Sequence, residues 1–259
     1  MHGPIGVFDS GIGGTSIWKE ITKLLPFENT VYLADSKNAP YGEKSEEDIL
    51  QLSIKNTDLL LKKKCKLIVV ACNTATTNAI HFLRKNYSVP FIGIEPAIKP
   101  AALRTKTKKV GVLATKGTLS STLFHNTAKI HASGIQIVEQ EGKGLVELIE
   151  KGKVNAKETA VLLGKYITPM LEQDIDCLVL GCTHYPYLVP VLKRILPGNV
   201  QIIDSGFAVA KQTKVVLERT QMLNTGQKEP KHFFHINTNS EVLKSFVDQK
   251  NTSISILDF

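Results

Sequence analysis

Short apolar runs recur along the chain and alternate with longer segments whose apolar residues have helical spacing. Each run has the length of a buried strand and is bounded by glycine or polar residues that favour turns. The predicted strands are Ile5–Phe8, Thr30–Ala34, Leu67–Ala71, Phe91–Ile94, Val110–Ala114, Ile135–Val138, Cys177–Leu180, Gln201–Ile203 and His232–Ile236. Strands that alternate with helices are typical of a parallel sheet covered by helices. The pattern therefore predicts an α/β fold.

Residues 45–62 give one of the clearer helix predictions. Ser45 is a suitable N-cap, acidic residues follow in the first turn, and lysines lie at the end. Ile49, Leu52 and Leu59 have helical spacing, so we expect them to pack against the sheet.

Two segments share one pattern and suggest two halves that are built alike. Residues 66–74 and 176–184 each contain a buried-strand run, a small residue, a cysteine and then polar residues that can cap a helix. The cysteines are Cys72 and Cys182. Each would present a thiol at the carboxyl end of a parallel strand, which is the edge where open parallel sheets bind ligands.

A cysteine after a run of Val, Leu and Ile is usually an inert core residue. The polar residues directly after Cys72 and Cys182 favour another interpretation, because a thiol among hydrogen-bond donors at a helix N-terminus becomes more reactive. Cys65 and Cys177 lack that context, so we assign them to structure. No two cysteines have CxxC spacing, which argues against a zinc ribbon or a thioredoxin-like site.

Residues 7–14 form another strand followed by a polar pair, Asp9-Ser10, and by glycines that lead into a helix. Such a turn can present backbone N–H groups to a carboxylate or phosphate, although a plain strand-to-helix turn has the same pattern. It is not a nucleotide fingerprint, because neither GxGxxG nor GxxxxGK[ST] occurs. Residues 38–42 predict a further turn, which carries the hydroxyl of Tyr41.

Composition narrows the class of protein. The 259 residues are 42% hydrophobic and 22% charged, enough for a large core, and no apolar run approaches the roughly 20 residues that span a bilayer. The first residues lack the pattern of a secretory signal, so we expect a cytoplasmic protein. A net charge of +8 raises nucleic acid as a partner. The lysine clusters precede strand-like runs, where solvated loops explain them, so no nucleic-acid partner is expected.

Taken together, the motifs resemble the glutamate racemase family within the wider aspartate/glutamate racemase superfamily. They occur in the family's order over residues 6 to about 206. The segments that carry the resemblance are Gly6–Gly14, Ala39–Gly42, Ala71–Ala75, Gly93–Ala97, Leu148–Glu150 and Gly181–Pro186. The chain departs from many relatives at Asn38, where they carry Arg, and at Ala34, where Gly is commoner.

The resemblance implies two pseudo-symmetric α/β domains that hold glutamate between them. Residues 1–96 with 207–259 would form the first domain, which carries Cys72, and residues 97–206 the second, which carries Cys182. One thiolate would remove the Cα proton and the other thiol would deliver a proton to the opposite face. Asp9 would assist Cys72, and His184 and Glu150 would assist Cys182. Asp9, Ser10, Tyr41, Gly42, Asn73, Thr74, Thr183 and His184 would bind the substrate.

The chemistry suits these residue types. A free thiol has a pKa of about 8.5, so a modest shift makes it a usable base, and fixed donors can stabilise the charge that develops near Cα. No lysine-centred cofactor motif or metal cluster is visible, which favours a reaction without cofactor or metal. The resemblance further implies a role in supplying D-glutamate for peptidoglycan, which links the protein to cell-wall biogenesis and cell shape. We also expect a homodimer.

Two other functions stay open. An aspartate or hydantoin racemase would use the same paired thiols on another side chain. A two-domain amino-acid-binding protein, or a basic accessory protein that binds nucleic acid, would tolerate the loss of either cysteine.

Overall fold

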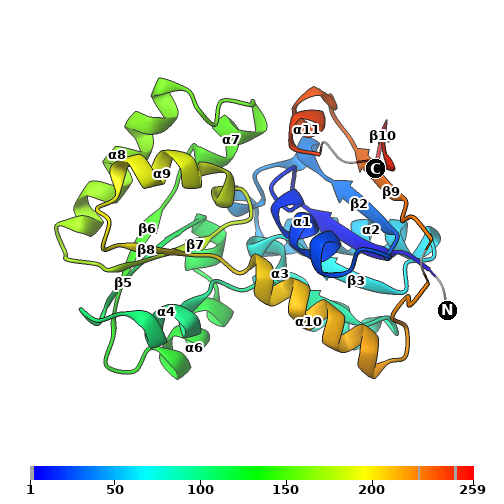
Figure 1. The fold of residues 1–259 in the computed structure, drawn as a ribbon, viewed down its shortest axis with the longest axis horizontal. Coiled ribbons are helices and arrows are strands. Elements are labelled where there is room, and N and C mark those ends of the chain that lie inside the picture. The colour runs from blue at the N-terminus through cyan, green and yellow to red at the C-terminus, as the bar shows by residue number, and fades with distance from the viewer. Residues whose placement is uncertain (1–2, 227, 248–249) are drawn as a thin grey trace.

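The computed structural model describes residues 3–226, 228–247 and 250–259, and it has two lobes, each built on one sheet (Figure 1). All strand pairs among these described residues are parallel. The prediction of two parallel sheets flanked by helices is confirmed. Residues 1–2, 227 and 248–249, which the predicted first domain includes, lie outside the described residues. The division at residues 96 and 206 stays a prediction.

The first lobe contains the six-stranded sheet, in the order β10-β9-β2-β1-β3-β4. Its strands are β1 (Ile5–Asp9), β2 (Thr30–Ala34), β3 (Leu67–Val70), β4 (Phe91–Gly93), β9 (His232–Ile236) and β10 (Thr252–Ile256). The helices of this lobe are α1 (Thr15–Leu24), α2 (Glu46–Lys62), α3 (Asn73–Asn86), α10 (Gly206–Arg219) and α11 (Glu241–Phe246). The central strand β1 pairs with β2 and β3, so the carboxyl ends of β1, β2 and β3 lie side by side.

The second lobe contains the four-stranded sheet, in the order β6-β5-β7-β8. Its strands are β5 (Lys109–Ala114), β6 (Gln136–Glu141), β7 (Cys177–Gly181) and β8 (Gln201–Ile203). The helices between β4 and β8 are α4 (Ile98–Arg104), α5 (Lys116–Leu119), α6 (Thr122–His131), α7 (Leu145–Glu150), α8 (Lys157–Leu171) and α9 (Val189–Ile195). The described part of the chain also contains the short 3-10 segments η1 (Ser36–Asn38), η2 (Tyr41–Glu43) and η3 (Tyr185–Leu188).

The nine predicted strands all occur, with ends that differ by up to three residues. The largest difference is β6, which continues through the polar residues Glu139–Glu141 because it pairs with β5 along its whole length at the sheet edge. The sequence did not predict β10, a largely exposed edge strand with only two apolar residues, Ile254 and Ile256.

Helix α2 begins one residue after Ser45, whose Oγ accepts a hydrogen bond from the Asp48 N–H at 3.1 Å, as an N-cap should. Of the three residues expected against the sheet, Ile49 is buried, whereas Leu52 and Leu59 are half-buried. The helix also buries Leu60 and the polar Asn56. Its buried stripe is therefore partly polar, which an apolar pattern alone does not reveal.

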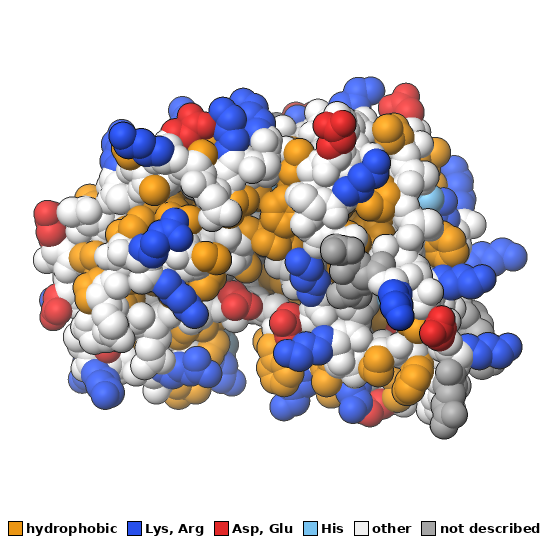
Figure 2. Space-filling model, turned by 45° about the horizontal axis from the view of Figure 1, so that its top comes forward, with side chains coloured by type: hydrophobic (Ala, Val, Ile, Leu, Met, Phe, Trp, Pro, Cys, Tyr) orange, Lys and Arg blue, Asp and Glu red, His pale blue; other side chains and the backbone are white. Residues whose placement is uncertain are grey.

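The surface carries lysine and arginine side chains on both lobes. On the face shown in Figure 2 they are scattered and interspersed with acidic side chains rather than gathered in one stripe. Among the described residues, no helix is both long enough and apolar enough to cross a bilayer.

Candidate active site

A small cavity of about 260 Å³, partly open to solvent, lies where the two lobes meet. It receives one thiol from each sheet, because Cys72 follows β3 and Cys182 follows β7. Carboxyl ends of parallel strands point toward a shared crevice, so the two lobes bring their ligand-binding edges together here. The lining residues are Ser10, Pro40, Tyr41, Gly42, Cys72, Asn73, Thr74, Thr115, Val146, Cys182, Thr183 and His184.

Cys72 lies at the N-terminus of helix α3, as the sequence predicted, but it caps the helix itself, whereas the polar residues after it were expected to do so. Its Sγ accepts a hydrogen bond from the Ala75 N–H at 3.4 Å, and its thiol donates to Ser10 Oγ at 3.7 Å. Burial, and then the neighbouring Asp9 carboxylate, raise the pKa of the Cys72 thiol well above its ordinary range. Cys72 therefore holds its proton near neutral pH.

Asp9 lies behind the cavity wall and is fully buried. The Gly14 N–H donates to its Oδ2 at 2.7 Å, and the hydroxyls of Ser10 and Thr183 lie 3.5 and 3.4 Å from its Oδ1. Burial raises the pKa of Asp9 to about 6, although the positive charge of His184 and the Gly14 N–H oppose that shift. Asp9 therefore reaches both lobes through hydroxyl groups that themselves line the cavity.

Cys182 is paired with a buried histidine. Its Sγ lies 3.7 Å from His184 Nδ1, and His184 Nε2 lies 2.6 Å from Glu150 Oε1. Burial alone would lower the pKa of His184, but the hydrogen bonds to Cys182 and Glu150 outweigh burial and raise it well above its ordinary value. An imidazolium at this place is positioned to pair with Cys182 when that sulfur loses its proton.

The turn after β1 does present its backbone N–H groups to carboxylates, but these belong to the protein itself. The Ile12 N–H donates to Glu150 Oε1 at 2.7 Å, and the Gly14 N–H donates to Asp9. The sequence predicted a turn that can present N–H groups to a carboxylate or phosphate, and the carboxylates found there are those of Glu150 and Asp9. The turn therefore holds the acid–base groups of the site.

Cys182 differs from Cys72 in the structure of the segment on its C-terminal side. That segment is the 3-10 turn η3, and helix α9 begins only at Val189. Pro186 and Pro190 lack backbone N–H groups, and the side chain of His184 makes no cap hydrogen bond. The two cysteine segments are therefore alike up to the thiol and different after it.

The remaining predicted binding residues surround the thiols. Asn73 is buried, yet neither its amide nitrogen nor its amide oxygen has a hydrogen-bond partner among the described residues. An unpaired buried amide that lines a cavity is a ready contact for a polar ligand. Thr74 Oγ1 lies 2.9 Å from Thr115 Oγ1, and Gly42 lies so close to Thr115 that a Cβ would be 2.8 Å from the Thr115 Cβ.

Tyr41 also lines the cavity, but its hydroxyl is used within the first lobe. The hydroxyl donates to Asp35 Oδ2 at 2.5 Å and accepts from Asn56 Nδ2 at 3.1 Å. Asn38 donates to Asp35 Oδ1 at 2.7 Å. Tyr41 thus contributes its position and ring rather than a free hydroxyl.

The two other cysteines lie away from the cavity. Cys65 lines a separate hollow together with Pro90 and Met222, and Cys177 is buried at the start of β7. Burial raises the pKa of Cys65 to about 12 and that of Cys177 to about 11. Both remain inert thiols under ordinary conditions, in agreement with a structural role.

Sequence reasoning missed four residues at the site, one of which is Pro40, which precedes Tyr41 and lines the cavity. Thr115 follows β5 at the same sheet edge as the cysteines, so the rule that located Cys182 would also have located it. Val146 lies on α7 and carries no polar signal. Ser36 donates to Glu150 Oε2 at 2.8 Å, a contact between the lobes that no sequence pattern indicates.

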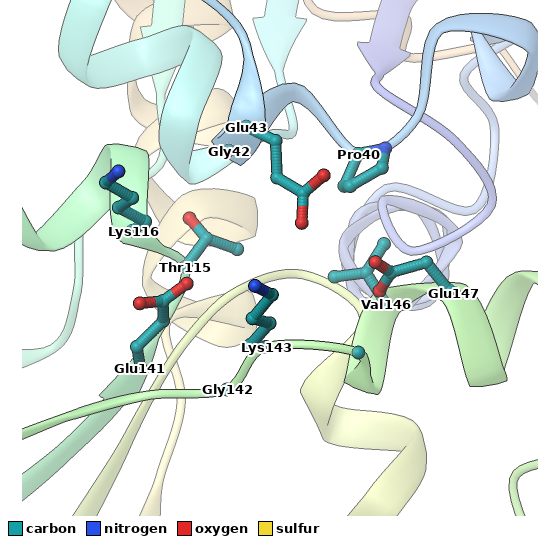
Figure 3. Close-up of a pocket in the computed structure, with 11 residues that line it drawn as sticks. Pro40, Gly42, Glu43, Thr115, Lys116, Glu141, Gly142, Lys143, Val146 and Glu147 are labelled. Atoms are coloured by element: carbon teal, nitrogen blue, oxygen red, sulfur yellow. The ribbon is translucent and has the colours of Figure 1, made fainter.

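A second, outer pocket of about 280 Å³ adjoins the cavity and shares Pro40, Gly42, Thr115 and Val146 with it. Figure 3 shows Glu43 from the first lobe and Lys143 from the second projecting into the same opening. This charged pocket therefore lies next to the cavity that the thiols line. Among the described residues, no group of three or more His, Cys, Asp or Glu side chains is arranged to hold a metal ion.

Comparison with known proteins agrees with this geometry. Residues 5–213 match the Asp/Glu/Hydantoin racemase family. A curated glutamate racemase from Herpetosiphon aurantiacus is 45% identical over 85% of this chain and 87% of its own. A crystal structure of a Bacillus anthracis glutamate racemase has a TM-score of 0.88 at 29% identity, covering 99% of this chain and 98% of the other. That of Escherichia coli glutamate racemase, in complex with L-glutamate and an activator, has a TM-score of 0.87 at 32% identity, with coverage of 99% and 98%. The chain therefore belongs to the Asp/Glu/hydantoin racemase family, and the glutamate racemases are the members of that family that it resembles.

Proposed function

We propose that this protein is a glutamate racemase that interconverts L- and D-glutamate by proton transfer at Cα between two cysteines. The observation that carries the proposal is that Cys72 and Cys182, one from each lobe, line the same cavity. A binding protein has no need of two buried thiols, each with its own titratable partner, at one ligand site.

The proton balance follows from the two pairs. In one direction Cys182 acts as the thiolate and takes the Cα proton, while the Cys72 thiol gives its proton to the other face of Cα. The product then leaves Cys182 protonated and Cys72 as the thiolate, so the opposite enantiomer reacts by the same steps in reverse. His184 and Glu150 pair with Cys182, whereas the Asp9 carboxylate raises the pKa of the Cys72 thiol and so favours the form of Cys72 that donates a proton.

Substrate binding uses the polar groups around the thiols. The unpaired amide of Asn73 can donate and accept at once, which suits the ammonium and carboxylate groups of an amino acid. Thr74, Thr183 and Ser10 add hydroxyls, and Tyr41 and Gly42 shape the wall. Donors fixed near the α-carboxylate stabilise the charge that develops as the Cα proton leaves, so the reaction requires no cofactor in this proposal.

The physiological setting is part of the same proposal. It rests on the resemblance to glutamate racemases, and it comprises a cytoplasmic homodimer that supplies D-glutamate for peptidoglycan.

The direct test is turnover of L-glutamate by purified protein without added cofactor, followed by chiral chromatography. We expect D-glutamate to form, and we expect Cys72→Ser and Cys182→Ser each to lower kcat by roughly 10³-fold or more. Cys65→Ser and Cys177→Ser are the matched controls and should retain turnover. Activity on aspartate alone would assign the protein to a sister activity, and full activity in both Cys72→Ser and Cys182→Ser would overturn the two-thiol mechanism.

A further inference from the structure

Glu150 joins the two lobes at the acid–base pair of Cys182. It lies at the end of α7 in the second lobe, and its Oε1 contacts His184 Nε2 at 2.6 Å in the same lobe. The same Oε1 accepts from the Ile12 N–H at 2.7 Å, and Oε2 accepts from Ser36 Oγ at 2.8 Å. Both of these donors belong to the first lobe, so each carboxylate oxygen of Glu150 is held from across the interface.

The support for Ser36 is rigid. Ser36 begins η1 directly after Asp35, whose carboxylate accepts from Asn38, Tyr41 and Asn237. The Asn237 Oδ1 accepts from the Lys37 N–H at 2.9 Å, which fixes the next residue as well. Because these hydrogen bonds hold the backbone around Ser36, the Ser36 hydroxyl has a defined direction, and it points toward Glu150.

The contact also has geometric consequences for the imidazole. A carboxylate whose second oxygen is unpaired can rotate about its terminal torsion, which is broad in energy. Ser36 removes that freedom and leaves Oε1 facing His184 Nε2, which in turn keeps Nδ1 3.7 Å from Cys182 Sγ. The arrangement is complete only when the lobes are closed, because neither lobe alone contains both Ser36 and Glu150.

We propose that Ser36 is a positioning residue: its hydroxyl fixes Glu150 from the opposite lobe and so aligns His184 with Cys182 in the closed enzyme. This inference rests on the proposed function, since it concerns the same proton transfers. A hydrogen bond to a charged acceptor changes an equilibrium constant by roughly 10-fold to 100-fold. We expect Ser36→Ala to lower kcat/KM by about that factor, and Ser36→Thr, which keeps the hydroxyl, to retain most activity.

An isotope effect separates positioning from a general structural defect. Ser36 supports only the Cys182 side, so Ser36→Ala should make proton transfer at Cys182 slower relative to transfer at Cys72. The primary deuterium effect on kcat/KM should then rise for one α-deuterated enantiomer and not for the other. The affected enantiomer should be the one affected in His184→Asn and the opposite of the one affected in Asp9→Asn.

Ser16→Ala provides the comparison for a hydrogen bond between the lobes that leaves Glu150 untouched, because Ser16 Oγ donates to the Thr183 carbonyl at 2.8 Å. It should not reproduce the rise of the isotope effect for one enantiomer that is expected in Ser36→Ala. Wild-type kcat/KM in Ser36→Ala, or equal changes of both isotope effects in that variant, would overturn the proposal.

A measurement without substrate distinguishes this inference from the proposed function. The His184 Nε2–H in its 2.6 Å contact with Glu150 should give a low-field proton resonance in the NMR spectrum, lost or shifted upfield in Ser36→Ala and kept in Ser16→Ala. If wild type and Ser36→Ala give the same resonance, Ser36 does not position the pair. If the resonance depends on Ser36 while glutamate is not turned over, the positioning stands and the proposed function fails.

Discussion

Gly13 lies directly against the ring of His184. A Cβ at residue 13 would be 2.2 Å from His184 Nδ1, and the Gly13 N–H is 3.2 Å from Nε2. Any side chain at this position would displace the imidazole that faces Cys182. The absence of a side chain at residue 13 is therefore a requirement of the site rather than of the turn.

Replacement of that glycine should abolish activity. We expect Gly13→Ala to lower kcat/KM by at least 100-fold, because the ring of His184 and the backbone of the first lobe cannot occupy the same space. Gly164→Ala in α8 is the matched control, since a Cβ there would meet nothing within 4 Å. It should keep full activity and raise the free energy of unfolding by about 0.5–1 kcal/mol. Steady-state kinetics and urea unfolding check both, and an active Gly13→Ala enzyme would contradict the placement of His184.

Asp9 should make stability depend on pH. Burial raises its pKa to about 6 in the folded protein from 3.8, so folding favours the protonated form. The stability that this proton confers is complete below pH 3.8 and is lost as the pH rises through 6. The difference between the two pKa values lowers the free energy of unfolding at pH 7 by about 3 kcal/mol, relative to its value below pH 3.8.

Asp9→Asn removes the charge and keeps the shape. It should therefore unfold at higher urea concentration than the wild type at pH 7 and at the same concentration near pH 3.5, while turnover is reduced but still measurable. Parallel pH dependences of unfolding for the two proteins would show that Asp9 is not a strained, buried acid.

Asn73 and Asn56 should respond oppositely to the same substitution. Asn73 makes no side-chain hydrogen bond with the described residues, so Asn73→Ala should change the free energy of unfolding by less than about 1 kcal/mol. Its kcat/KM for glutamate should nevertheless fall by roughly 10-fold to 100-fold, because the substrate loses a partner.

Asn56 donates to the Tyr41 hydroxyl and to the Leu52 carbonyl, so Asn56→Ala should cost about 1–3 kcal/mol of stability. Denaturant unfolding and kinetics on both variants check the contrast. A large loss of stability in Asn73→Ala would mean that its amide serves the fold and not a ligand.

A buried ion pair anchors the end of the first lobe that lies away from the cavity. Lys66 Nζ lies 2.7 Å from Glu28 Oε2, both side chains are 2% exposed, and Nζ also donates to the Met222 carbonyl. Glu28→Gln leaves the Lys66 charge buried without its counter-ion, so we expect a loss of about 3–5 kcal/mol. The double variant Glu28→Gln with Lys66→Met should recover part of that loss. Thermal unfolding tests this, and a single variant as stable as wild type would contradict the burial of the charge.

Much of the fold was predictable because buried strands and helices each require a characteristic spacing of apolar residues in the sequence. The runs that end at Asp9, Cys72 and Cys182 place three chemical groups at the carboxyl ends of strands, and parallel pairing then brings such ends to one edge. Strand β10 has no apolar run that predicts a strand, because an exposed edge strand needs few apolar residues.

The meeting of the two lobes was not predictable from periodicity. Ser36 and Glu150 are 114 residues apart, and a serine hydroxyl bonded to a carboxylate has no sequence signature. The backbone of residues 11–14 gave a partial signal: a turn suited to anions was visible, but the identity of the anion as Glu150 depends on how the second lobe packs. The resemblance to glutamate racemases implied that Glu150 assists Cys182. Only the geometry shows that the Ile12 N–H and the Ser36 hydroxyl hold the Glu150 carboxylate.

The measurement that tests the two-thiol mechanism most directly is isotope incorporation at Cα. L-glutamate is converted in deuterated water and the reaction is stopped at low conversion. The two enantiomers are then separated, and the deuterium content of each is measured by mass spectrometry. Two thiols on opposite faces predict D-glutamate with one deuterium at Cα, whereas the remaining L-glutamate stays unlabelled. Deuterium that enters both enantiomers at equal rates would indicate a single base and would contradict the roles assigned to Cys72 and Cys182.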